Sequence, residues 1–349
     1  MTITFNIIIL FIDLIAIYGL RRSKSAVRWA AVLMLALLAE IFIAAALARD
    51  RFDLGRLGCY LIFLHGCVLS AGFGIIVWPK RRKTAILSGI CAAGLPILAY
   101  YVFLLEPYWL DVTYRRITGA KIAAPLKIAV LADLQTENFG DYERAVLRRM
   151  MQEKPDLILL AGDYIQAPAE QRRAIVGQVN AFLREIRLSA PYGVFAVQGN
   201  VDPPGWPEIF AGSDVTCASA RESFDLGPLG LTCLGLADSF NPGVVVNNPY
   251  PDKYHLVLGH APDFAMGRVQ ADLLVAGHTH GGQVRIPLLG PIITNCRVPR
   301  TWAAGSTPLG DGRELLVSRG VGMERDNAPR LRFCCRPELI VVELTPEKK

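Results

Sequence analysis

Four long apolar stretches fill the first third of the chain and constrain its fold more than any other feature. They cover residues 3–20, 27–48, 57–78 and 84–107. Each is about long enough to cross a bilayer core of roughly 30 Å as a helix. The hydrophobic content of 52% and the mean hydropathy of +0.33 are high for a soluble chain. Because the first stretch lacks the charged start and cleavage site of a secretory signal, we expect a retained four-helix transmembrane anchor over residues 1–110.

The charge is unevenly distributed and indicates an orientation. Residues 1–110 carry eleven Lys and Arg against five Asp and Glu, whereas residues 111–349 carry 26 of each sign. A neutral globular part argues against nucleic-acid binding and leaves a phospholipid bilayer as the expected partner. The basic loops at 21–28 and 80–83 are expected on the cytoplasmic side of the membrane, so residues 108–349 would face outward. Basic residues at 115–127 leave the opposite orientation open.

Three ionisable residues, Asp13, Glu40 and His65, lie inside these apolar stretches. Such groups are costly in a bilayer and raise a functional hypothesis. We favour hydrogen bonding between packed helices, because nothing else in the stretches indicates a transport path.

Beyond a linker expected at residues 111–124, the pattern becomes that of an α/β domain over 125–349. Short apolar runs alternate with amphipathic segments at 140–153 and 169–187, with Asp141 as the candidate cap of the first helix. This alternation predicts βαβ units with a site at the carboxyl ends of the strands. Shorter strands at 215–236, 283–286, 314–318 and 337–344 make a second sheet plausible. The expected strands before the candidate site residues are 127–132, 156–161, 192–197, 254–258 and 272–276.

Residues that can bind metals follow these strands. Residues 277–283 read Gly-His-Thr-His-Gly-Gly-Gln, which places two imidazoles one residue apart at a strand end. No Cys-x-x-Cys spacing occurs among the eight cysteines, which argues against a structural zinc site. Seven oxygen and nitrogen donors suit two metals that share one carboxylate. These donors are Asp133, Gln135, Asp163, Asn200, His260, His278 and His280.

The order Asp-x-Gln, Gly-Asp, Gly-Asn-x-Asp, Gly-His and Gly-His-Thr-His-Gly-Gly-Gln resembles the calcineurin-like metallophosphoesterases over about residues 125–345. Segments 284–287, 318–322 and 337–342 are similar to the membrane-anchored bacterial YkuE/YaeI-like subgroup. The resemblance implies a metal-dependent phosphoester hydrolase. It also implies a four-layer αββα sandwich, which would follow the all-α transmembrane region.

The resemblance further implies a dinuclear centre of Mn, Fe or Zn type, so two divalent metal ions are the expected cofactors. Asp163 would bridge the metals, and Asp163, Asn200 and His278 are the expected catalytic residues. The positions carried over give Asp133, Gln135, Asp163 and His280 to the first metal, and Asp163, Asn200, His260 and His278 to the second.

Two positions depart from the family pattern. The family usually has histidine at Gln135, and an amide oxygen is a weaker ligand for borderline metals, so the first site would bind loosely or favour Mn²⁺. The family often has histidine at Val201, where it contacts phosphate and protonates the leaving group. Valine can do neither, and such acid catalysis is typically worth about 10²–10⁴ in rate. We therefore predict a preference for pyrophosphate linkages or activated diesters over alkyl monoesters.

The expected reaction is in-line attack on phosphorus by a hydroxide that bridges the metals. Arg285 and Arg319 are candidate substrate-binding residues, although surface salt bridges fit them equally well. Asp202 is expected to support the ligands, and His255 to be structural. The anchor favours a lipid-linked phosphorylated substrate, such as UDP-2,3-diacylglucosamine for a cytoplasmic domain or an envelope phosphodiester for an outward one.

Two other classes of function stay open. Gln135 and Val201 are compatible with a catalytically weakened, membrane-anchored metal- or phosphate-binding module. Asp13, Glu40 and His65 are the only support for a transporter or sensor. The presence of Asp163 together with all three histidines of the centre favours an enzyme.

Overall fold

The computed structural model describes residues 2–23 and 25–347 and divides into two compact units. One unit comprises Met1–Leu105 together with Glu324–Arg330, and the other comprises Glu106–Met323 with Leu331–Lys349. We describe each unit by itself.

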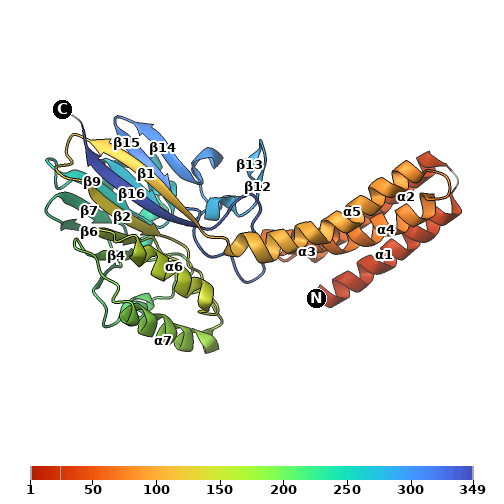
Figure 1. The fold of residues 1–349 in the computed structure, drawn as a ribbon, viewed down its shortest axis with the longest axis horizontal. Helices are drawn as coiled ribbons and strands as arrows, with labels where there is room; N and C mark the ends of the chain where they lie inside the picture. Colours follow the sequence, from red (N-terminus) through yellow and green to blue (C-terminus); the bar gives the residue numbers. More distant parts are fainter. Residues whose placement is uncertain (1, 24, 348–349) are drawn as a thin grey trace. The chain divides into compact units, whose positions relative to one another are not determined.

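The first unit contains the four apolar stretches as helices, which confirms that part of the prediction (Figure 1). The four candidate membrane spans are Thr2–Arg22, Ala26–Leu47, Arg51–Val77 and Arg82–Tyr108, so the third begins six residues earlier than predicted. Few of their side chains are buried, as expected for helices whose outer faces contact lipid. The elements are α1 (Thr2–Arg22), α2 (Ala26–Leu47), α3 (Arg51–Tyr60), α4 (Gly66–Val77) and α5 (Arg82–Tyr100), with π-helical turns at Leu61–His65 and Tyr101–Leu105.

The polar residues of the spans face each other inside this helical unit. The Nδ1 atom of His65 lies 2.7 Å from Asp13 Oδ2, and its Nε2 atom lies 3.0 Å from Asn6 Oδ1. All three ionisable side chains, including Glu40, are buried. Hydrogen bonding between packed helices is therefore confirmed for Asp13 and His65.

The second unit is built on a six-stranded sheet whose centre is a parallel βαβαβ segment, as predicted. Strands β2, β3 and β4 are parallel, and α6 and α7 connect them. Gly140, not Asp141, is the N-cap of α6, because Glu143 accepts a hydrogen bond from the Gly140 amide at 3.0 Å. The sheet order is β1 (Asp111–Gly119), β16 (Glu338–Pro346), β2 (Leu126–Leu131), β3 (Leu157–Leu160), β4 (Val194–Val197) and β5 (Val215–Ala218), with α6 at Asp141–Gln152 and α7 at Ala169–Glu185.

The segment expected to be a linker supplies an edge strand instead. Residues 111–119 form β1, which pairs in parallel with β16 along its whole length. No residue of β1 is fully buried, which suits an edge strand of the sheet.

A second six-stranded sheet, inferred from the sequence only as plausible, packs against the first. Its order is β14 (Gly305–Gly310), β15 (Arg313–Val317), β11 (Leu273–Ala276), β9 (Tyr254–Leu258), β7 (Leu229–Cys233) and β6 (Glu222–Asp225). Two small ribbons accompany it, β8 (Val245–Val246) with β10 (Arg268–Val269) and β12 (Arg285–Ile286) with β13 (Gly290–Pro291).

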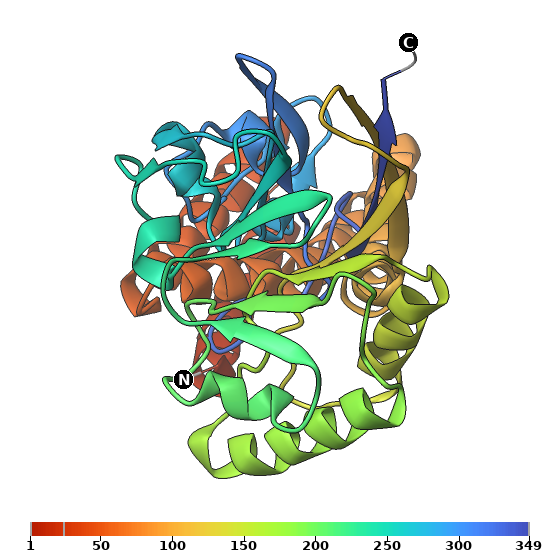
Figure 2. The same cartoon turned by 90° about the vertical axis from the view of Figure 1, so that its left-hand side faces the viewer.

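Three apolar clusters define the layers of this unit. One joins inward-facing residues of both sheets, such as Val130 and Leu159 from the first and Leu256 and Val275 from the second. A second cluster fills the space between the first sheet and helices α6 and α7, which Figure 2 shows on its outer face. In the described residues, short helical segments lie over the outer face of the second sheet, including the turn Pro262–Met266. This arrangement places the carboxyl ends of β2, β3, β4, β9 and β11 at one edge of the stacked sheets.

Candidate metal centre

The predicted ligands follow five strands of the two sheets. Asp133 and Gln135 follow β2, Asp163 follows β3 and Asn200 follows β4 in the first sheet. In the second sheet His260 follows β9, and His278 and His280 follow β11. All but Asn200 are buried. The stacked sheets therefore bring together donors that are up to 147 residues apart in the sequence.

The centre of this group is formed by Asp163, His260 and His278, whose candidate ligand atoms all lie within 4.8 Å of one another. His260 Nε2 lies 3.4 Å from Asp163 Oδ2 and 3.0 Å from Asn200 Oδ1. The other ring nitrogen of His260 lies 2.7 Å from the carbonyl oxygen of Ala161. That contact assigns the ring proton to Nδ1 and leaves Nε2 to face the other donors.

Asp133 and Gln135 are joined to the same group through the backbone. The amide of His278 donates to both carboxylate oxygens of Asp133 at 3.0 and 3.1 Å. The amide of Gln135 donates to the carbonyl oxygen of Asp163 at 2.8 Å, and its side-chain Nε2 donates to Gln166 Oε1 at 3.1 Å. The loops after β2, β3 and β11 are thus hydrogen-bonded into one framework.

Five of the seven predicted ligands have a left-handed backbone conformation. Non-glycine residues rarely adopt it, and strained residues cluster at functional sites because the surrounding structure holds them there. These φ values indicate that the loops are shaped for the direction of their side chains. The residues are Asp133 (+52°), Gln135 (+38°), Asp163 (+57°), His278 (+68°) and His280 (+49°).

Asp202 supports the loop that carries Asp163, as the sequence predicted. Its carboxylate accepts hydrogen bonds from the amides of Asp163, Tyr164 and Gly199 at 2.8–2.9 Å. Gly199 lies so close to Asp163 that a Cβ atom at position 199 would be 2.0 Å from Asp163 Oδ1. The Asp163 loop and the Gly199 turn can therefore be packed this closely only without a side chain at 199.

His280 gives a direct test of whether these residues fit a metal. Its side chain is buried, and within the described part of the chain neither of its ring nitrogens has a hydrogen-bond partner. A buried imidazole without a partner is unfavourable unless a ligand satisfies it. Imidazole and carboxylate groups are also the donors that Mn, Fe and Zn ions accept. The donor set therefore fits a divalent metal centre.

The protonation of these groups follows from burial and from their mutual charges. Burial raises the pKa of Asp133 to about 8. Burial alone would lower the pKa of His260, but the Asp163 carboxylate outweighs it and raises this pKa to about 9. Burial alone would raise the pKa of Asp163, yet His260 holds it below the usual range. Burial and then the charge of Arg332 lower the pKa of His280 well below its usual value.

Metal loading is expected to release about two protons per chain at pH 7, because the pKa of Asp133 is about 8 and that of His260 about 9 in the metal-free protein. Both groups must lose their protons to bind a metal, so apparent affinity should rise from pH 7 to 9 and then level off. Calorimetric Mn²⁺ titrations of the full chain in two buffers of different ionisation enthalpy measure the number. Release of no protons at pH 7 would contradict this charge assignment.

Arg332 is a residue near the centre that the sequence analysis missed. It is fully buried, and its guanidinium donates to the carbonyl oxygens of Gly322 at 3.2 Å, Cys335 at 3.0 Å and Arg319 at 2.9 Å, with a further bond to Gly320. This buried cation favours the neutral form of His280, which is the form that binds metals. No sequence signal marks it, because it is one of several arginines in an irregular segment.

The two predicted substrate arginines have partners within the protein. Arg285 Nη1 donates to the carbonyl oxygen of Gly281 at 3.1 Å. Arg319 Nη2 lies 2.8 Å from Asp111 Oδ2 and 3.1 Å from Glu338 Oε1. Substrate binding by either stays a prediction. His255 is buried in the second sheet between Thr232 and the carbonyl oxygen of Gln270, which confirms a structural role.

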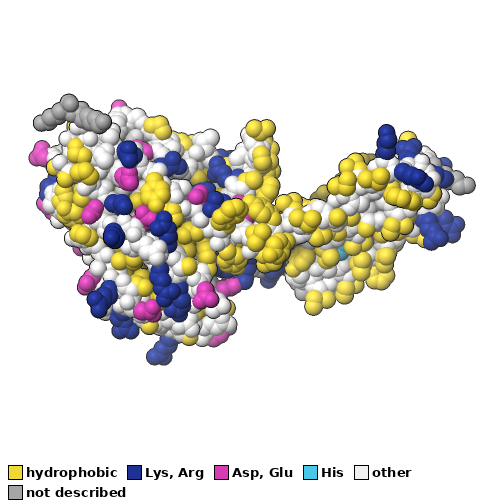
Figure 3. Space-filling model, viewed as in Figure 1, with side chains coloured by type: hydrophobic (Ala, Val, Ile, Leu, Met, Phe, Trp, Pro, Cys, Tyr) yellow, Lys and Arg dark blue, Asp and Glu magenta, His cyan; other side chains and the backbone are white. Residues whose placement is uncertain are grey.

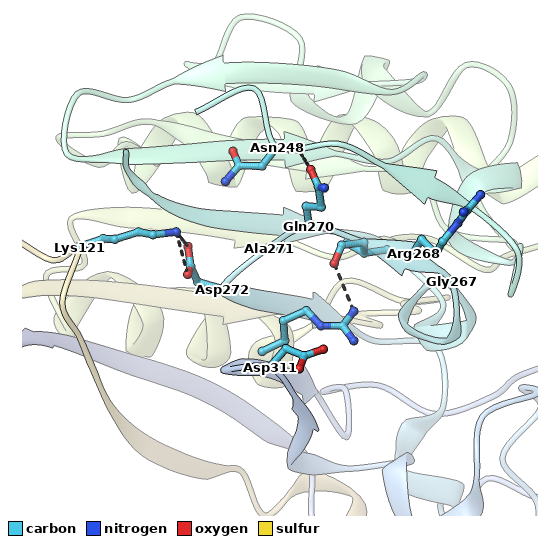
Figure 4. Close-up of a pocket in the computed structure, with 10 residues that line it drawn as sticks. Lys121, Asn248, Gly267, Arg268, Gln270, Ala271, Asp272 and Asp311 are labelled. Carbon is cyan, nitrogen blue, oxygen red and sulfur yellow. Dashed lines mark hydrogen bonds and ion pairs between the residues drawn. The ribbon is translucent and has the colours of Figure 1, made fainter. Parts of the chain in front are cut away.

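A surface cavity of about 470 Å³ lies at the opposite, amino ends of β11 and β15 (Figure 4). Within it Lys121 pairs with Asp272, and Arg313 donates to the carbonyl oxygen of Val269 at 3.2 Å. The four residues of β11 span roughly 13 Å between this cavity and the histidines. The cavity is therefore not part of the candidate metal centre.

Comparison with known proteins supports this interpretation of the site. Residues 126–282 match the family model of the calcineurin-like phosphoesterases. The chain is 31% identical to phosphodiesterase YaeI of Escherichia coli over 264 residues, which cover 70% of this chain and 92% of YaeI. It is 29% identical to the metallophosphoesterase YkuE of Bacillus subtilis over 272 residues, which cover 70% of this chain and 88% of YkuE.

Proposed function

Because this chain belongs to the calcineurin-like phosphoesterase family and is thus a phosphoester hydrolase, we propose that it cleaves a phosphodiester or pyrophosphate bond at a membrane, with two divalent metal ions. The observation that carries the proposal is the convergence of Asp163, His260 and His278 at one edge of the stacked sheets. The name of YaeI, a phosphodiesterase, supports a diester substrate over a monoester.

The proposed ligand sets are those expected from the sequence, with Asp163 shared. When bound, the metals supply charge to neutralise the phosphoryl group and to activate water. Asp202 and the Gly199 turn hold Asp163 in place, and the Ala161 carbonyl fixes the orientation of His260. The framework thus presents the ligands before any metal binds, which lowers the cost of reorganisation.

Val201 determines the proposed class of leaving group. Its side chain is half-buried next to Asn200 and has no proton that it can donate to a leaving group. Its backbone amide donates to Asp163 Oδ1 at 2.9 Å. A leaving group that departs as a stable anion, such as a phosphate or an aryl oxide, needs no acid at this position. The proposal therefore favours pyrophosphates and activated diesters over alkyl monoesters.

The proposed substrate is lipid-linked, and the four candidate spans support this choice because, once inserted, they would hold the domain at a bilayer. We propose an outward-facing domain at a bacterial inner membrane, on the basis of the basic loops at 21–28 and 80–83. An envelope phosphodiester suits that side, and UDP-2,3-diacylglucosamine suits the cytoplasmic one. The four-layer αββα arrangement is part of the proposal, with α8 (Leu236–Ser239) and Pro262–Met266 in the outermost layer.

The alternative is a weakened metal- or phosphate-binding module, for which Gln135 and Val201 are the supporting observations. The two functions differ in one measurable property, since a module binds Mn²⁺ without hydrolysing an aryl phosphodiester. Binding without turnover in the full chain would favour the module.

Replacing Val201 with histidine is expected to raise kcat/KM for an alkyl phosphomonoester about a hundredfold, because it adds a proton donor next to Asn200. Turnover of an aryl phosphodiester should change by less than about threefold, since its leaving group needs no proton. Val201→Ala is the matched control for the change of size. Equal changes on both substrates, or the same response in the alanine variant, would contradict the assigned role of this position.

A further inference from the structure

The β12–β13 hairpin carries a cluster of exposed apolar side chains that no part of the described chain covers. Figure 3 shows hydrophobic side chains gathered on this hairpin, which protrudes from the surface of its domain. Leu288 is fully exposed and Leu289 is 72% exposed. We call residues 286–293 the apolar hairpin. Its other exposed apolar members are Ile286, Ile292 and Ile293.

The two leucines at the tip of the apolar hairpin are exposed and are not packed against the rest of the described chain. Leu288 has a φ of +70°, a conformation that a leucine rarely adopts in a free turn. Gly290, two positions later, also has a positive φ, of +78°, which a glycine adopts without strain. Contiguous exposed apolar groups of this kind mark a surface that binds a partner or a membrane.

The charges around the hairpin are of one sign. Residues 281–310 contain three arginines and no aspartate or glutamate. Arg300 and Arg285 are anchored by backbone carbonyls, since Arg300 Nε donates to Pro291 at 2.7 Å and Arg285 to Gly281 at 3.1 Å. Arg297 and Arg300 are exposed. An apolar tip with a cationic base is complementary to acyl chains beneath anionic headgroups.

The base of the hairpin is joined to the metal-binding loop. His278 Nε2 lies 3.1 Å from the carbonyl oxygen of Asn295, just after the hairpin. A Cβ atom on Gly282 would lie 2.4 Å from Pro291 Cβ, so the two segments are in close contact there. Any surface that holds the tip therefore also holds the His278 loop at a fixed distance from itself.

We propose that the apolar hairpin inserts Leu288 and Leu289 into the interfacial layer of an anionic phospholipid bilayer, with Arg297 and Arg300 at the headgroups. A bilayer is favoured over a protein because the chain itself carries four candidate spans. The exposed cluster is also small compared with the roughly 1,200 Å² that a stable protein interface buries. The inference goes beyond the proposed function, because the contact does not require hydrolysis.

The test uses the full chain in vesicles of phosphatidylglycerol and phosphatidylcholine that contain a diazirine-labelled phospholipid. After photolysis and trypsin digestion, the label is expected on peptide 286–297. The control is peptide 254–268, which carries the isolated exposed residue Met266. In the variant Leu288→Asp/Leu289→Asp, the label on peptide 286–297 should fall about tenfold, since the variant lacks the two apolar side chains proposed to enter the bilayer. The control variant Met266→Asp should lose none of the label on peptide 286–297.

Turnover of a soluble aryl phosphodiester is measured on the same samples and separates the two proposals. An active protein with no label on 286–297 would overturn the membrane contact. Label on 286–297 without turnover would support the contact while the proposed function fails. The aspartate variant should retain soluble-diester turnover, because both side chains are exposed at the hairpin tip and neither is a candidate ligand.

Discussion

Replacing Asp163 with asparagine is expected to lower phosphodiester turnover about a thousandfold and to reduce bound Mn²⁺ from two ions per chain to at most one. The bridging carboxylate contributes to both proposed sites, and loss of several kcal/mol of transition-state stabilisation corresponds to this factor. The fold should persist, because an amide oxygen can still accept the Val201 hydrogen bond seen at 2.9 Å. Steady-state kinetics and elemental analysis of the full chain measure both effects.

Asp311→Asn is the matched control for this substitution. Asp311 also has a left-handed backbone, with a φ of +51°, but it lies exposed in the turn between β14 and β15. Asparagine tolerates that conformation as well as aspartate does, so the control should behave as wild type. If Asp163→Asn kept both its metal content and its turnover, the shared-ligand assignment would be wrong.

Replacing Arg332 with methionine is expected to destabilise the globular unit by roughly 3 kcal/mol, because at least four backbone carbonyls lose their donor in a fully buried setting. For a domain of this size the change corresponds to a fall in Tm of roughly 6–12 °C. Thermal unfolding of the full chain in detergent, followed by tryptophan fluorescence, measures it. Metal affinity should fall as well, because the segments that Arg332 ties together adjoin His280 and Asp133.

Arg268→Met serves as the control for the loss of one positive charge. Arg268 is exposed, and no ion pair is observed for it in the described residues. A surface substitution of this kind should shift stability by less than about 0.5 kcal/mol. If the Arg332 variant unfolded at the same temperature as the control, the buried guanidinium would not be required for stability.

The candidate metal ligands could be picked out in the sequence because each follows a short apolar strand. A buried strand in a parallel arrangement leaves its carboxyl end at the sheet edge, and the residue after it points into the same region. Asp163 after β3 and His278 after β11 both follow this rule. The four candidate spans could also be predicted from the sequence, because a helix needs about twenty consecutive apolar residues to cross a bilayer.

Other features depend on contacts between distant segments and left no local signal. The sequence predicts a linker where β1 lies, because an edge strand needs no continuous apolar run and its partner β16 lies more than 200 residues away. Arg332 is buried only because four separate backbone carbonyls surround it. The exposed tip at Leu288 looked like ordinary apolar sequence, because exposure is a property of the folded chain.

The most direct test of the central claim is a titration of the metal-free full chain with Mn²⁺, in which bound metal and hydrolysis of an aryl phosphodiester are measured at each step. Turnover is expected to reach its plateau at two ions per chain, with the diester cleaved faster than the corresponding monoester. A plateau at one ion, or two bound ions with no turnover of either substrate, would contradict a dinuclear phosphodiesterase centre.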